Sequence, residues 1–187
     1  MSNRTNNLPT RFTFQFNVTT SGTPEQLQVK RRAVTIAFNE NTANADTITD
    51  SASGFLVAGF QPGDNITVSG SASNDGTYVI ASVTAGTITL LARNDLATEA
   101  AGATVTIVAP KTVPDGIGVT IKAKNANSGN ITIGYSSASA LNTGTGWFSM
   151  DNNESVGLQV ENINNIWLDC TVSGEGVEVL FEKNVQA

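Results

Sequence analysis

The sequence predicts an all-β fold: an antiparallel β-sandwich formed by a discontinuous outer domain, which carries an inserted, small, barrel-like β domain. Apolar and polar residues alternate in short runs, as in 117–123, and a period of two is typical of strands with one buried face. Polar turn residues, as in 127–130 and 151–153, separate these runs. A change in charge between residues 33 and 110 indicates where the inserted domain lies.

The N-terminal residues divide into an arm and a strand. Residues 1–10 are polar and include Pro9, so we expect a flexible arm. Residues 11–18 then alternate between polar and apolar side chains, which predicts a strand whose apolar face needs a partner sheet. That apolar face consists of Phe12, Phe14, Phe16 and Val18.

The segment from residue 33 to residue 110 has its own set of short strands. Asn74-Asp75-Gly76 and Ala85-Gly86 predict hairpin turns, because Asn, Asp and Gly accept positive φ angles. A set of strands this dense can close into a small barrel. The predicted strands are 34–38, 47–50, 65–69, 77–84, 87–91 and 104–108.

Two helical turns are expected within the same segment. The first covers 51–59, with Asp50 or Ser51 as its N-cap and Gly59 as its end. The second is expected over 94–102.

We interpret the chain as an outer domain made of 11–32 and 111–187, with a middle domain, 33–110, inserted into one of its loops. The middle segment begins and ends in strands, so its two ends can lie side by side, and close-set ends make an insertion tolerable. Sequential domains, with 12–18 as a swapped or stray arm, remain the alternative.

Charge supports this division. Residues 33–110 contain one basic and seven acidic residues, a net of −6, whereas the remainder contains nine of each and is neutral. The neutral outer domain and the acidic middle domain indicate that the middle domain faces solvent and the outer domain faces other proteins. Four cations are expected at the junction, either as a solvated hinge or in contact with an acidic neighbour: Lys30, Arg31, Arg32 and Lys111.

The residue types argue against an enzyme and against cofactors. The chain has no histidine and one cysteine, Cys170, so zinc and the commonest general base are excluded, and we interpret Cys170 as a small buried residue. No phosphate-binding loop or dinucleotide motif occurs. The sequence pI of about 4.5 disfavours nucleic acid. No apolar run is long enough to span a membrane. The polar N-terminus lacks the apolar core of a signal peptide, so we expect synthesis in the cytoplasm.

Aromatic residues near the C-terminal third permit a further interpretation. Trp147, Phe148 and Trp167 are the side chains that an aromatic platform for a sugar ring would use. In a β-sandwich, such residues more often belong to the core or to a protein interface. Both uses remain open at this point.

Several runs of the outer segments occur in a recognisable order: V-P-D-G-I-G-V-T-I-K-A-K at 113–124, N-S-G-N-I-T-I-G at 127–134, E-S-V at 154–156 and V-E-N-I-N-N-I-W at 160–167. Together with T-T-S-G-T-P-E-Q-L at 19–27, this order resembles a recurrent β domain of tailed-bacteriophage virion proteins. The middle segment, with G-F-Q-P-G-D at 59–64 and N-D-G-T-Y at 74–78, is similar to a small β module of phage structural proteins.

The resemblance implies a non-enzymatic structural component of a phage particle, in the first place a capsid decoration or cement protein. Its partners would be the major capsid protein or other virion proteins, and it would form homo-oligomers in the virion without nucleic acid, membrane or small-molecule substrate. A tail, neck or baseplate protein is the first alternative, and a receptor- or carbohydrate-binding module is the second. The expected interface residues are Arg11, Phe12, Phe14, Phe16, Lys30, Arg31, Arg32, Lys111, Trp147 and Phe148.

Overall fold

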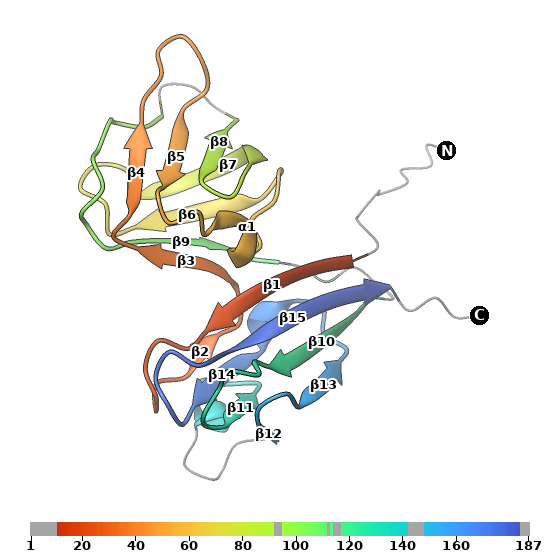
Figure 1. Ribbon diagram of the computed structural model, residues 1–187. Helices are drawn as coiled ribbons and strands as arrows, with labels where there is room; N and C mark the ends of the chain where they lie inside the picture. The colour runs from red at the N-terminus through yellow and green to blue at the C-terminus, as the bar shows by residue number, and fades with distance from the viewer. Residues whose placement is uncertain (1–10, 92–94, 112, 114–116, 142–147, 184–187) are drawn as a thin grey trace, which may run out of the picture.

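The computed structural model is an all-β protein made of three antiparallel sheets (Figure 1). It describes residues 11–91, 95–111, 113, 117–141 and 148–183. Two sheets have four strands each and the third has seven. The predicted all-β class with antiparallel, sandwich-like sheets is thereby confirmed, whereas the predicted N-terminal arm lies outside the described residues.

The first four-stranded sheet contains the N-terminal and the C-terminal strands side by side. Its apolar side chains lie opposite one another across the ladders, as Phe14 pairs with Val179 and Val179 with Ile121. All three side chains are buried, so this face forms one half of a core. The order is β1 (Arg11–Asn17), β15 (Gly176–Lys183), β10 (Ile117–Ala123) and β13 (Ser155–Leu158).

The second four-stranded sheet supplies the other half of that core. Ile131, Ile133, Leu168 and Cys170 are buried within it. Burial raises the pKa of the Cys170 thiol to about 11, with the nearby carboxylates adding to the shift, which agrees with a buried structural residue. The order is β12 (Phe148–Met150), β11 (Ile131–Gly134), β14 (Trp167–Cys170) and β2 (Glu25–Gln26), with α2 (Ser137–Ala140) and η1 (Ile163–Asn165) in the connections.

The seven-stranded sheet is formed by the middle of the chain. Its strands alternate buried apolar and more exposed polar residues, as in β6, where Ile66 and Val68 are buried. In Figure 1 the sheet curls, so that β4 and β5 stand steeply across β3 and β9. The order is β3 (Val29–Ala33), β9 (Val105–Ala109), β6 (Asn65–Ser69), β7 (Gly76–Val83), β8 (Thr87–Leu90), β5 (Thr47–Asp50) and β4 (Ile36–Asn39).

The chain passes between the sheets at β3 and β9. Val29 pairs with Ala109 and Ala33 with Val105, so these two strands run side by side where the chain enters and leaves the seven-stranded sheet. The predicted division placed 29–32 in the outer domain. The ladder instead joins them to the seven-stranded sheet, because the strand that follows Gln28 pairs with β9.

The expected helical turns are only partly correct. α1 covers Phe55–Ala58 and ends at Gly59, whose φ of 93° is left-handed as expected. Its N-cap is Gly54 and not Asp50 or Ser51, since the Asp50 carboxylate bonds the turn before the helix. The helical turn predicted over 94–102 is wrong within its described part, where 95–102 is irregular and Glu99 bridges Phe38.

The acidic residues of the middle segment largely hold its loops together. Among the described residues, five of its seven carboxylates accept backbone N–H groups, and Asp46 and Asp50 are buried. These two charges therefore lie inside the fold and not on its surface, because a carboxylate can satisfy several loop amides at once. The five are Asp46, Asp50, Asp64, Asp75 and Glu99.

Candidate functional site

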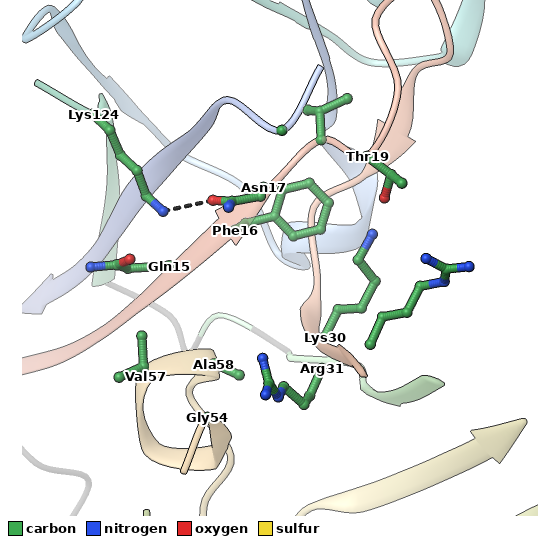
Figure 2. Close-up of a pocket in the computed structure, with 13 residues that line it drawn as sticks. Gln15, Phe16, Asn17, Thr19, Lys30, Arg31, Gly54, Val57, Ala58 and Lys124 are labelled. Carbon is green, nitrogen blue, oxygen red and sulfur yellow. Dashed lines mark hydrogen bonds between the residues drawn. The ribbon is translucent and has the colours of Figure 1, made fainter. Parts of the chain in front are cut away.

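A cationic groove lies between the N-terminal strand and the seven-stranded sheet (Figure 2). We call it the β1 edge groove; its volume is about 380 Å³. Consecutive residues of β1 and the following turn form one side, consecutive residues of β3 form another, and α1 closes one end. It is lined by Gln15, Phe16, Asn17, Val18, Thr19, Lys30, Arg31, Arg32, Gly54, Val57, Ala58, Lys124 and Gly174.

Arg31 is fixed in this groove by Asp50. The Arg31 Nε donates to Asp50 Oδ2 at 2.7 Å, and Thr35 Oγ1 donates to Asp50 Oδ1 at 2.6 Å. The backbone N–H groups of Ala52 and Gly54 donate to the same carboxylate at 3.0 Å. Burial opposes the ionisation of Asp50, but these hydrogen bonds outweigh it and lower its pKa from 3.8 to about 2.

Glycine at position 54 allows the Arg31 side chain to lie against the α1 turn. A Cβ atom there would overlap the guanidinium at Nε and Cζ. The absence of a Cβ atom at Gly54 therefore leaves the space that the Arg31 guanidinium occupies in the β1 edge groove.

Lys30 is also paired. Its Nζ forms an ion pair with Glu25 and lies 4.8 Å from the centroid of the Phe16 ring. Burial opposes the ionisation of Glu25, yet its hydrogen bonds with Lys30 and the Thr19 N–H lower its pKa. The ion pair of Lys30 with Glu25 thus links β3 to β2.

Two cations of the groove have no carboxylate hydrogen-bonded to them within the described residues. Arg32 is exposed. Lys124 Nζ donates at 2.6 Å to the neutral Oδ1 of Asn17, and burial lowers the pKa of Lys124 although Glu178 opposes this shift. The sequence pattern does not indicate Lys124, Asn17 or Gln15, because their proximity to the basic run depends on the pairing of β1, β15 and β10.

Lys111 does not join the other three predicted cations. Its Nζ donates to Asp64 Oδ1 and Oδ2 at 2.5 and 2.6 Å and lies 5.1 Å from the centroid of the Phe12 ring. It therefore links the turn before β6 to β1 and does not line the β1 edge groove.

The predicted aromatic face of β1 belongs mostly to the core. Phe14 and Phe16 are each 2% exposed, so almost all of each side chain is packed within the core. Phe12 is half-buried, and its ring centroid lies 5.9 Å from that of Phe14 and 5.4 Å from that of Phe181. Arg11 begins β1, but its side chain lies outside the described residues.

A second groove, of about 580 Å³, lies over the outer face of the first sheet. We call it the outer-face groove. Leu56 and Val57 of α1 line this groove, and their side chains are 51% and 57% exposed. Val57 and Gln15 line both grooves, so the two meet beside α1. Neither Leu56 nor Val57 was predicted, because the sequence marked 51–59 only as a helical turn.

The predicted aromatic platform is described only in part. Phe148 is 41% exposed and, with Ile133, Val156 and Leu158, lines a small apolar cavity of about 280 Å³. Trp167 is half-buried in β14. Trp147 lies outside the described residues.

Comparisons with known proteins and the search for metal and membrane features add no assignment. No family model, curated protein or solved structure matches the chain. Among the described residues, no group of three or more Cys, Asp or Glu side chains could hold a metal ion. No helix in that part of the chain has the length and hydropathy needed to cross a bilayer.

Proposed function

We propose that this chain is a non-enzymatic structural component of a tailed-bacteriophage particle, acting as a capsid decoration protein in a homo-oligomeric form. The resemblance to phage virion proteins supports the proposal, since its runs at 117–124, 127–134, 154–156 and 160–167 fall in the two facing four-stranded sheets and their connections. The partner would be the lattice of the major capsid protein.

The observation that carries the proposal is the surface around α1. Two exposed apolar side chains, Leu56 and Val57, stand between two grooves whose other lining residues are mainly polar or charged. An apolar centre with a polar rim is the usual composition of a protein interface. Many copies on one particle would give avidity even where each contact is weak.

A tail, neck or baseplate position would use the same surface, and copy number separates the two locations. Quantitative mass spectrometry of purified particles measures the ratio of this chain to the major capsid protein. We expect a ratio near that of a lattice component, on the order of hundreds of copies per particle as repeated binding implies. A few copies per particle would place the protein in the tail, and its absence from particles would contradict the proposal.

The surface itself is tested with a substitution that leaves the core untouched. Leu56→Asp with Val57→Asp should abolish binding to particles that lack the protein, whereas Val172→Asp, at another exposed apolar residue (45% exposed), should not. Equal binding by both variants would exclude α1 from the interface.

A further inference from the structure

The β1 edge groove lies between two strands that each end a sheet. β1 is the last strand of its four-stranded sheet and β3 the last strand of the seven-stranded sheet. Gln15–Thr19 and Lys30–Arg32 line the groove as consecutive residues, so main chain as well as side chains border it. Within the described ladders, β1 pairs only with β15 and β3 only with β9.

The backbone of β1 offers polar groups to this groove. The Val18 N–H donates to the Glu175 carbonyl, and the Val18 carbonyl accepts from the Gly174 N–H, so Val18 directs both groups toward β15. Because backbone groups alternate along a strand, Gln15 and Asn17 direct theirs away from β15, toward the side where the groove lies.

The charge of the groove has one sign. Four cations line it and no carboxylate does. Lys30 and Arg31 are engaged by Glu25 and Asp50, whereas Arg32 and Lys124 have no hydrogen-bonded carboxylate among the described residues. Val57 and Ala58 add an apolar end wall from α1. The surface is therefore complementary to carboxylates flanked by apolar side chains.

We propose that the β1 edge groove receives an extended acidic segment of a neighbouring protein, whose carboxylates pair with Arg32 and Lys124 and whose apolar side chain packs on Val57. This inference deepens the proposed function by naming the chemistry of the partner.

A peptide assay tests the groove without reference to any particle. The probe is a short labelled peptide in which Glu and Val alternate, and its control contains Gln in place of Glu. At low ionic strength, fluorescence anisotropy should show about tenfold tighter binding of the Glu peptide. Equal binding of the two peptides, or tighter binding of a labelled single-stranded DNA, would overturn the proposal.

Charge reversal identifies the residues. The double variant Arg32→Glu, Lys124→Glu should bind the Glu peptide about tenfold more weakly than the wild type does. It should bind a Lys–Val peptide instead. Lys122→Glu is the matched control, since Lys122 lies on the outer face of the same sheet, 3.8 Å from Glu178. Because Lys124 is half-buried, Arg32→Glu alone is measured too, and thermal melting verifies that each variant is folded. A loss in Lys122→Glu equal to that in the double variant would assign the effect to overall charge and overturn the proposal.

Binding to particles that lack the protein separates this inference from the proposed function. If the wild-type chain and the Arg32→Glu, Lys124→Glu variant bind particles equally, the groove is not the contact although the structural role stands. If the wild-type chain fails to bind particles but discriminates between the peptides, the structural role fails and the groove stands.

Discussion

Among single residues, Asp50 connects several parts of the chain beside the β1 edge groove. Its side chain is fully buried. It accepts hydrogen bonds from Arg31 of β3, from Thr35 between β3 and β4, and from the backbone of the turn that follows β5. A buried carboxylate is stable only with such partners, and removing them leaves an uncompensated charge. The position of Arg31 in the groove therefore depends on Asp50 being ionised.

This dependence predicts a loss of stability in acid. The pKa of Asp50 is about 2 in the folded chain and about 3.8 when the chain is unfolded, so ionised Asp50 stabilises the fold above pH 3.8. As pH falls from about 4 to about 2, this contribution of about 2 kcal/mol is lost. Urea denaturation across this pH range should show a decreasing free energy of unfolding.

Asp50→Asn provides the comparison. The variant should be less stable at neutral pH by about 2 kcal/mol, because Arg31 loses its charged partner. Its free energy of unfolding should also change less between pH 4 and pH 2, whereas Glu40→Gln, at an exposed position, should behave like the wild type. An acid slope in Asp50→Asn as steep as in the wild type would show that other carboxylates cause it.

At the scale of elements, α1 joins the seven-stranded sheet to β1. Gly59 ends the helix in a left-handed conformation, and a Cβ atom at this position would overlap Phe14 Cβ. The same helix presents Leu56 and Val57 to solvent. One short element thus both packs on the first sheet and forms the exposed apolar surface.

Gly59→Ala should therefore destabilise the protein through two effects. The left-handed φ of 93° costs an alanine about 1 kcal/mol, and the overlap with Phe14 adds about 1–2 kcal/mol. Gly22→Ala is the control, because Gly22 has a φ of 75° with open space around it and should show the first effect alone. Chemical denaturation measures both variants, and equal losses would mean that α1 does not pack tightly on β1.

The sequence predicts the elements of this fold better than the surface that they form. Alternation identified β5 and β6 with their correct limits, because one face of each is buried and the other is wet. The helical turn predicted over 94–102 is wrong for 95–102, since Leu96 is buried and its N–H is satisfied by the distant Asp46 carboxylate. Local patterns carry no information about such a partner, which lies 50 positions away.

The same limit applies to the candidate site. A run of three cations was visible at 30–32, but whether each charge was compensated depended on Glu25 and Asp50. Phe14 and Phe16 were expected at an interface, but an aromatic strand face serves a core equally well. Only the pairing of β1 with β15 decides that both side chains are buried.

At the scale of the whole molecule, three sheets form two packed bodies that meet beside β1 (Figure 1). No described ladder joins the seven-stranded sheet to either four-stranded sheet. The contacts between them include α1 on β1 and the ion pair of Lys111 with Asp64. We therefore propose that the two four-stranded sheets can fold without the middle of the chain.

Deletion of residues 29–109 tests this proposal. Val29 and Ala109 are directly paired, so their Cα atoms lie about 5 Å apart and a short Gly-Ser linker can join Gln28 to Pro110. We expect a folded but less stable protein, because Phe12 and Phe14 lose the cover of α1 and Gly59. Dispersed amide signals in an NMR spectrum would support the division, and an unfolded product would contradict it.

The pairing of β3 with β9 also bears on how such a chain can arise. Because the two crossing points lie side by side, a single insertion there would add a segment without rethreading any strand of the two four-stranded sheets. Conversely, exchanging that segment for another of similar span would leave the ladders of both four-stranded sheets unchanged and would replace the seven-stranded sheet together with α1. Inheritance of the two parts can thus follow separate histories.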